Sequence, residues 1–210
     1  MSAAQGSPEW LLERCGKVTA SRVADILAKT KSGPAASRQN YLAQLVAERL
    51  TLTVEQGFTN AAMQHGTEHE PIARALFEVS TGLTVDEVGF VPHPTIDMAG
   101  ASPDGLVGDD ELIEIKCPNT ATHIDYLLAD VVPAKYKPQM AWQLLCTGRK
   151  RCHFASFDPR MPEDLQLFLV LYEPTAEYLA EVTAEIVAFI AEVDSTVAKL
   201  EAIQQKKAGR

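Results

Sequence analysis

Two charged residues interrupt an apolar stretch near the middle of the chain, Leu112-Ile113-Glu114-Ile115-Lys116. The apolar residues favour a buried strand, and a charge inside such a strand needs a partner. Side chains of a strand alternate between its faces, so Glu114 and Lys116 point to the same side. Upstream, Ser102-Pro103-Asp104-Gly105 predicts a turn into a hairpin that brings Asp104 close to both. Two carboxylates and an amine are therefore expected to converge at a sheet edge.

This trio suits the hydrolysis of a phosphodiester bond. Mg²⁺ prefers carboxylate and carbonyl oxygens, so Asp104, Glu114 and the backbone carbonyl of Ile115 are candidate ligands. The metal would activate a water molecule and stabilise charge on the scissile phosphate. Three roles stay open for Lys116, which are orienting that water, accepting its proton if the lysine pKa is depressed, and stabilising the transition state. A solvated hairpin face with one ion pair is the structural alternative, and the pattern alone does not separate the two.

Helical patterns surround a middle section of short strand patterns. Asn60 to about Ser80 predicts a helix that Gly66 and Pro71 bend or restart, and Lys31–Ser37 predicts a loop. The other expected helices are at about 8–14, 19–27, 41–50, 120–130, 136–147 and 175–205, and the expected strands at 83–91, 97–101, 111–116, 152–157 and 166–172. This order predicts an α/β or α+β fold with one central mixed β-sheet flanked by α-helices.

The bulk properties indicate one soluble domain spanning residues 1–210, with a C-terminal helix from about residue 175. The chain contains no run of 18 apolar residues, so no membrane span is expected. Its first residues lack the basic-then-apolar order of a signal peptide, which predicts a cytoplasmic protein. The four cysteines form no CxxC pair, so we expect reduced thiols rather than a zinc or iron–sulfur site.

The net charge of −9 argues against a protein that coats nucleic acid over its whole surface. It leaves room for an enzyme that handles DNA in a local cleft, because a bound divalent ion cancels the negative charge of its carboxylate ligands.

Several motifs resemble those of a known enzyme family. Asp104, Glu114 and Lys116 match the signature of the PD-(D/E)xK nuclease superfamily. The surrounding sequence resembles the phage λ exonuclease family, the alkaline exonucleases or YqaJ-type viral recombinases. The segments that carry the resemblance, in family order from about residue 9 to 173, are 16–21, 45–48, 66–70, 102–106, 114–118 and 157–161. One short signature is weak support for a family, whereas this whole series is strong.

The resemblance implies roles for individual residues around the catalytic centre. Asp104 and Glu114 are similar to the family's metal-binding carboxylates, and Lys116 to its catalytic lysine. Glu70 matches an acidic residue that the family places on a helix at the metal site. Gln139 matches a glutamine near the active centre.

The resemblance also implies a pocket for the 5′-phosphate of a DNA end, with Arg14 and Ser21 as its binding groups. Physical chemistry supports this role independently. A helix that opens at Thr19 to Ser21 offers free N–H groups and a positive dipole end to an anion, and Arg14 adds a bidentate grip. Without the resemblance, a plain N-cap at Ser21 and a surface charge at Arg14 would be the favoured explanation.

The family further implies a Mg²⁺-dependent 5′-to-3′ exonuclease, in which Mn²⁺ substitutes for Mg²⁺. Such an enzyme digests linear double-stranded DNA to mononucleotides and leaves a 3′ single strand for recombination. It also implies a homotrimer ring around double-stranded DNA and a single-strand annealing protein as partner. A ring needs only a basic channel, and the candidate lining residues are Lys29, Lys31, Arg38, Lys135 and Lys137.

Other functions remain as alternatives. An endonuclease or junction resolvase is possible on the same core, as is a DNA-binding module that has lost catalysis. His65-x-x-Glu68-His69 spells an inverted zinc-peptidase motif, whose histidines would stand one turn apart on a helix. Gly66 and Pro71 weaken that helix, and no third ligand is evident in the sequence.

Overall fold

A five-stranded mixed sheet forms the centre of the protein in the computed structural model, which describes residues 3–31, 33–55 and 61–208. Its strands are β4 (Val85–Asp86), β7 (Gly105–Val107), β8 (Glu111–Lys116), β9 (Arg151–Phe157) and β10 (Leu167–Tyr172). They are ordered β10-β9-β8-β7-β4, with β8 and β9 parallel and the other neighbours antiparallel. The expected central mixed sheet is confirmed.

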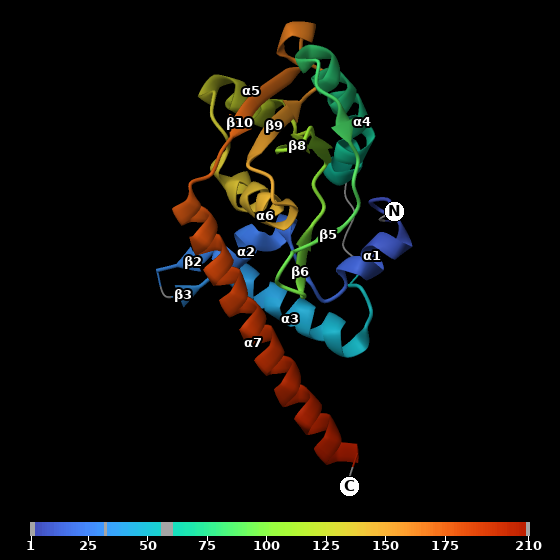
Figure 1. The fold of residues 1–210 in the computed structure, drawn as a ribbon, viewed down its shortest axis with the longest axis vertical. Coiled ribbons are helices and arrows are strands. Elements are labelled where there is room, and N and C mark those ends of the chain that lie inside the picture. Colours follow the sequence, from blue (N-terminus) through green and yellow to red (C-terminus); the bar gives the residue numbers. More distant parts are fainter. Residues whose placement is uncertain (1–2, 32, 56–60, 209–210) are drawn as a thin grey trace.

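Helices cover both faces of this sheet and continue beyond it (Figure 1). They are α1 (Pro8–Arg14), α2 (Val23–Leu27), α3 (Ala36–Thr51), α4 (Ala61–Thr81), α5 (Thr120–Ala129), α6 (Lys137–Thr147) and α7 (Ala176–Ala208), with 3₁₀ turns η1 (Ala20–Arg22), η2 (Ala134–Tyr136) and η3 (Glu163–Leu165). A second sheet has the order β1-β6-β5, and a small hairpin pairs β2 with β3. These strands are β1 (Val18–Thr19), β2 (Lys29–Thr30), β3 (Gly33–Pro34), β5 (Val91–Pro92) and β6 (Ala99–Ala101). In the described part of the chain, every helix is too short or too polar to cross a membrane.

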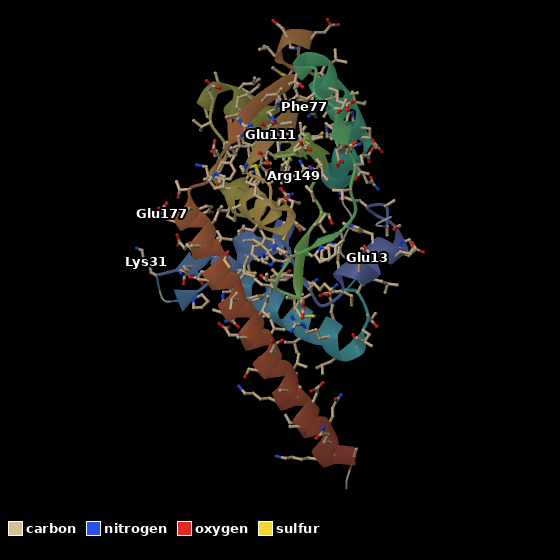
Figure 2. All side chains as sticks on the ribbon, viewed as in Figure 1. Glu13, Lys31, Phe77, Glu111, Arg149 and Glu177 are labelled. Carbon is tan, nitrogen blue, oxygen red and sulfur yellow. The ribbon has the colours of Figure 1, made fainter. Side chains whose placement is uncertain are left out.

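The alternation of side chains along β8 divides the apolar core between its two faces. Ile113 and Ile115 pack in one cluster with Phe77 of α4, which is labelled in Figure 2. Leu112 points to the opposite face and packs in a second cluster with Met140 of α6. Burying each of these side chains contributes about 1.5–3 kcal/mol. The central strand is therefore held from both sides, and Glu114 and Lys116 occupy the α6 face.

The first part of α7 completes a third core, beside α2, α3 and α6. Val182, Ile186 and Phe189 are buried there. Farther along, residues 198–208 are exposed, and this end of the helix stands clear of the other elements (Figures 1 and 2). Helix α7 thus packs on the core at its beginning and projects from it at its end.

Ion pairs attach α7 to helix α3 and strand β2. Arg38 contacts both carboxylate oxygens of Glu192, at 2.9 and 2.7 Å, and Lys29 lies 2.6 Å from Glu185. Arg38 is only 7% exposed. A buried guanidinium with a bidentate carboxylate partner has no surface to offer to DNA, so the prediction that Arg38 lines a channel is wrong.

Two predictions about local structure need correction. Helix α4 does not restart at Gly66 or Pro71 but continues through both, although an internal proline costs about 3 kcal/mol. Its packing on the sheet through Phe77 outweighs that cost; Asn60, its predicted first residue, lies outside the described residues. The expected loop Lys31–Ser37 contains β3 and the first residues of α3.

Candidate active site

Glu114 is a fully buried carboxylate on strand β8, and three side chains neutralise or bind it. Lys116 forms an ion pair with its Oε1 atom from the same face of the strand. Gln139 of α6 donates to Oε1 over 2.6 Å, and Gln143, one turn later, donates to Oε2 over 2.5 Å. The partners that a charge in an apolar strand requires are therefore present. Resemblance implied Gln139, whereas Gln143 had no predicted role, although its position four residues after Gln139 puts it on the same helix face.

Asp104 lies in the connection between β6 and β7 and reaches the same centre. Its Oδ2 atom accepts a hydrogen bond of 2.6 Å from the backbone N–H of Ile115. Burial and the nearby charge of Glu114 raise the pKa of Asp104 well above its usual range, and the charge of Lys116 offsets part of this effect. The predicted convergence of Asp104, Glu114 and Lys116 is confirmed as geometry.

The position of this centre in the sheet differs from the prediction. Strand β8 is the middle strand of the sheet, and Glu114 and Lys116 pair with β9, whereas the pairing with β7 ends at Ile113. The centre therefore lies on the middle strand, beyond the point where β7 leaves it. The pairing with β9 is parallel, and it joins residues about 40 positions apart in the chain. A local pattern of alternating residues carries no information about such a neighbour.

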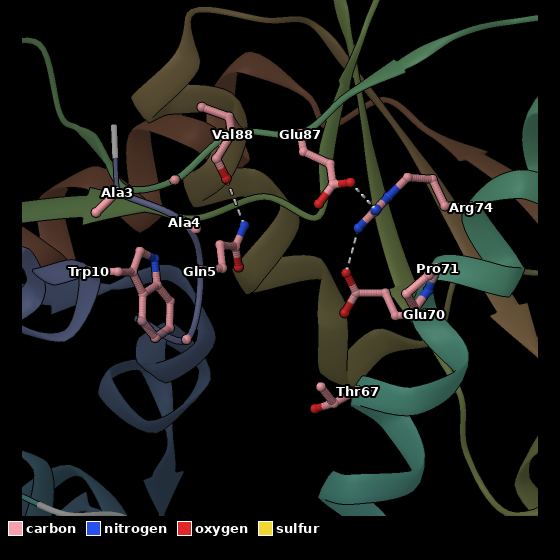
Figure 3. Close-up of a pocket in the computed structure, with 12 residues that line it drawn as sticks. Ala3, Ala4, Gln5, Trp10, Thr67, Glu70, Pro71, Arg74, Glu87 and Val88 are labelled. Atoms are coloured by element: carbon pink, nitrogen blue, oxygen red, sulfur yellow. Dashed lines mark hydrogen bonds and ion pairs between the residues drawn. The ribbon is translucent and has the colours of Figure 1, made fainter. Parts of the chain in front are cut away.

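Glu70 approaches the centre from helix α4. Burial raises its pKa, the ion pair with Arg74 lowers it, and the charge of Glu114 raises it further. Its Oε1 atom lies 2.8 Å from Arg74 (Figure 3). The structure thus brings Glu70 within electrostatic reach of Glu114, as the resemblance implied.

Lys116 is a cation held between carboxylates. Burial lowers its pKa, but the charges of Glu114 and Asp104 outweigh burial and leave the pKa above its ordinary value. Its ammonium group also lies 5.3 Å from the centre of the Tyr136 ring. In this arrangement Lys116 is paired with Glu114, which suits a role in orienting a water molecule or stabilising transition-state charge.

The donor atoms suit a hard divalent cation. Three carboxylates, from Glu70, Asp104 and Glu114, repel one another when ionised, and a bound cation would relieve that repulsion. All three supply oxygen ligands, which Mg²⁺ and Mn²⁺ accept. Within the described ranges no three His, Cys, Asp or Glu side chains are already arranged as a metal cluster. The carboxylates are instead bonded to Lys116, to Arg74, to a backbone N–H and to two glutamines.

A small cavity joins this centre to the predicted phosphate-binding residues. Its volume is about 180 Å³, and its lining includes Arg14, Thr19, Ser21, Asp104 and Gln139. The guanidinium of Arg14 lies over the Trp10 ring, 3.8 Å from its centre. Residues nearly a hundred positions apart in the chain thus face one space.

The predicted helix start at this cavity is only partly correct. Ser21 lies in the 3₁₀ turn η1, and α2 begins later, at Val23. Thr19 makes no side-chain cap, and its N–H donates to the hydroxyl of Tyr41 over 3.1 Å. The N–H of Thr19 is therefore not available to an anion, because it already donates to the hydroxyl of Tyr41 on α3.

Two further residues of this cavity had no predicted role. Ser102 and Trp10 both line it, and the indole N–H of Trp10 donates to Ser102 Oγ over 2.9 Å. Ser102 can still donate its own hydroxyl hydrogen. Its place two residues before Asp104, in Ser102-Pro103-Asp104-Gly105, was the signal that could have found it.

His65 and His69 share a face of α4, with ring centres 4.1 Å apart. Atom Nδ1 of His69 lies 2.8 Å from the carbonyl oxygen of His65. The spacing prediction was correct, but among the described residues no third His, Cys, Asp or Glu joins the two histidines in a group that could hold a metal. The arrangement therefore adds no support for a zinc peptidase.

Comparisons with known proteins agree with this geometry. Residues 9–150 match the YqaJ-like viral recombinase domain family. The structure is similar to an alkaline exonuclease (LHK-Exo) from Laribacter hongkongensis, with 50% sequence identity and a TM-score of 0.89 over 95% of this chain and 99% of that one. The same values hold for a structure of LHK-Exo in complex with dAMP.

A phage related exonuclease from Haemophilus somnus 129PT is 16% identical, with a TM-score of 0.70 over 88% of this chain and 96% of that one. That likeness concerns the fold alone. Curated protein sequences gave no match.

Proposed function

The chain belongs to the family of YqaJ-like viral recombinase domains, and we propose that it is a Mg²⁺-dependent 5′-to-3′ exonuclease. It would digest linear double-stranded DNA to mononucleotides. The strand that is not digested would remain as a 3′ single strand for recombination. A nuclease activity agrees with the family and with the alkaline exonuclease that is half identical to this chain. The metal, the direction and the duplex substrate are the finer parts of the proposal.

One observation carries the proposal, which is the cavity that Asp104 and Gln139 share with Arg14 and Ser21. An exonuclease must hold a strand end and cut a short distance from it. A cation and a hydroxyl suited to a terminal phosphate lie here beside a carboxylate suited to a metal. An endonuclease has no need of an end-binding pocket next to its catalytic carboxylates.

The residues that would hold the metal are Asp104, Glu114, Glu70 and the backbone carbonyl of Ile115. When bound, a divalent cation supplies Lewis-acid stabilisation of the scissile phosphate and lowers the pKa of an attacking water. The two glutamines of α6 hold Glu114 in a single orientation, which keeps its oxygens where a ligand is needed.

The chain's own cations act on the DNA. Lys116 is charged and faces the same centre, so it stabilises negative charge that develops at the cleaved phosphate or orients the water. Arg14 binds the terminal 5′-phosphate, with Ser21 and Thr19 as hydroxyl donors beside it. Together they fix the distance between the strand end and the bond that is cut.

The wider assembly follows from the family and stays part of the proposal. We expect one domain over residues 1–210, a homotrimer ring around the DNA, and a single-strand annealing protein that loads on the 3′ strand. The proposed substrate implies a cytoplasmic site of action. Light scattering at micromolar concentration tests the ring, which a purely monomeric species would exclude.

The test uses three DNA substrates, namely a linear duplex with 5′-phosphates, the same duplex with 5′-hydroxyls, and a closed circle. Each is incubated with Mg²⁺, with Mn²⁺ and with EDTA. We expect mononucleotides from linear DNA only, with either metal, and fastest from phosphorylated ends. Cutting of the circle would identify an endonuclease instead. Absence of cleavage under all conditions would reject the nuclease proposal.

A further inference from the structure

Arg74 joins two carboxylates beside the active site (Figure 3). Its Nη2 atom lies 2.8 Å from Oε1 of Glu70, and its Nη1 atom lies 2.6 Å from Oε1 of Glu87. The three side chains line a cavity of about 670 Å³. Glu70 is a candidate metal ligand, whereas neither Arg74 nor Glu87 has a role in the proposed reaction so far.

Burial separates this ion pair from an ordinary surface pair. The side chain of Arg74 is 12% exposed, that of Glu70 is 34% exposed, and that of Glu87 is 72% exposed. Exposed pairs contribute little, but a desolvated guanidinium must keep its partners. The neighbouring residue Ala73 and Phe77, one turn later, are fully buried against the sheet and hold this part of α4 in place. The backbone of α4 is therefore fixed at Arg74, and its largely buried guanidinium is paired with two carboxylates.

The charges around Glu70 explain what this arrangement achieves. Asp104 and Glu114 repel the carboxylate of Glu70, and Lys116, which attracts it, is already paired with Glu114. A glutamate at a helix surface would respond by rotating toward water. Arg74 prevents this by bonding one oxygen of Glu70 from its own helix, four residues on. A planar guanidinium suits the task because its separate N–H groups bind two carboxylates at fixed angles.

We propose that Arg74 is a positioning residue that holds Glu70 toward Asp104 and Glu114, while Glu87 anchors the guanidinium from the outer side. One oxygen of Glu70 is occupied by Arg74, and the other is left for a divalent cation. The inference rests on the proposed function, since it requires Glu70 to be a metal ligand.

The test measures binding of Mg²⁺ and Mn²⁺ to the DNA-free full chain by calorimetry, together with the Mg²⁺ concentration that gives half-maximal cleavage. Arg74→Gln is expected to weaken metal binding about 10- to 100-fold, the range typical of residues that orient metal ligands. Arg74→Lys keeps the positive charge but not the planar guanidinium that binds two carboxylates, so its loss of metal affinity should be smaller. Glu87→Gln should cause the smallest loss, because Arg74 then keeps only its bond to Glu70. Saturating Mg²⁺ should restore much of the cleavage rate of all three variants.

Arg151→Gln is the matched control, because it removes an arginine–glutamate pair, with Glu111, that lies outside both cavities. It should leave metal binding unchanged. Melting temperatures in EDTA show whether each variant is folded, and Arg74→Lys guards against failure of the glutamine variant. If the Arg74 variants fold and bind metal as tightly as the wild type, the inference is overturned. In that case, cleavage of DNA by the wild-type chain still supports the proposed function. A wild-type chain that neither binds metal nor cleaves DNA would overturn both.

Discussion

The catalytic half of the candidate site, residues 104–116, belongs to the central sheet, whereas the proposed phosphate half, residues 14–21, connects short elements near the N-terminus. The catalytic half includes a strand with hydrogen-bonded neighbours on both sides. The phosphate half has only two residues in a strand, β1, at the margin of a small sheet.

Bonds from α3 replace sheet pairing in the phosphate half. The Tyr41 hydroxyl accepts from Thr19, Glu48 accepts from the N–H of Gly16 over 2.7 Å, and Arg49 donates to the Gly16 carbonyl over 2.8 Å. Gly16 has a φ of +69°, and a Cβ atom there would lie 2.7 Å from the Arg49 side chain. Backbone ladders therefore hold the catalytic half, and individual side chains hold the phosphate half. Substitutions should accordingly affect chemistry in one half and end recognition in the other.

The largest effect is expected for Lys116→Ala. Loss of a cation that stabilises transition-state charge should lower the cleavage rate about 10²- to 10³-fold. Single-turnover cleavage of a linear duplex measures this effect. The ratio of rates for 5′-phosphate and 5′-hydroxyl ends should not change, because the phosphate half is intact. Lys150→Ala, which removes an exposed pair with Asp110, is the control and should behave as wild type. Retention of more than a tenth of the rate would remove Lys116 from the chemistry.

Arg14→Ala should have the next largest effect, confined to phosphorylated ends. A lost charge-assisted hydrogen bond of about 1.5–3 kcal/mol corresponds to a fall of about 10- to 100-fold in kcat/KM. Cleavage of a 5′-hydroxyl duplex by the same variant is the internal control. If the variant cuts 5′-phosphate and 5′-hydroxyl duplexes with the same loss of rate, the catalytic and phosphate halves do not act separately.

The two halves should also differ in what a lost hydrogen bond does to stability. Gln143→Leu leaves one oxygen of the buried Glu114 without its donor, which should lower the free energy of unfolding by about 1–3 kcal/mol.

Tyr41→Phe removes the hydroxyl that binds Thr19 and should lower the free energy of unfolding by about 0.5–1.5 kcal/mol. It should also weaken the preference for phosphorylated ends. Urea unfolding of both variants and the wild type gives the values. The opposite order of costs would contradict the view that the sheet carries the more tightly held half.

A last effect concerns pH and a contact just outside the catalytic half. Burial raises the pKa of Asp158, but hydrogen bonds from Arg160 outweigh it and lower the pKa to about 2. Arg160 also donates to the carbonyl of Pro118, just beyond β8. A depressed pKa contributes stability above the ordinary pKa of about 4, and this stability is lost as pH falls toward 2.

Asp158→Asn should therefore cost about 1–2 kcal/mol at pH 5–7, and the difference from wild type should shrink between pH 4 and pH 2. Urea unfolding across that pH range measures it. A difference that does not depend on pH would show that the carboxylate charge is not the stabilising feature.

The convergence of Asp104, Glu114 and Lys116 was predictable because the rule behind it is local. In a strand, residues two apart share a face, so Glu114 and Lys116 meet whatever the strand's neighbours are. A buried charge must also have a partner, which pointed to Asp104 and Lys116 together. Resemblance extended this set to Glu70 and Gln139, which lie on α4 and α6.

Other parts of the site depend on contacts between distant segments. Gln143 reaches Glu114 because α6 packs on the sheet, and Ser102 accepts a hydrogen bond from Trp10. Arg74 of α4 pairs with Glu87, which lies on a different segment. The central place of β8 depends on parallel pairing with β9, and Tyr41 decides that the N–H of Thr19 is occupied.

The sequence by itself thus determined most of the helices, the faces of β8 and the meeting of Asp104, Glu114 and Lys116, because these follow from the repeat of a strand or helix and from the cost of burying charge. Only the tertiary structure decided which strand is central, which oxygen of Glu70 is occupied and how the two halves meet in one cavity. These features depend on which distant segments pack together, and a periodic pattern carries no information about its partner across the chain.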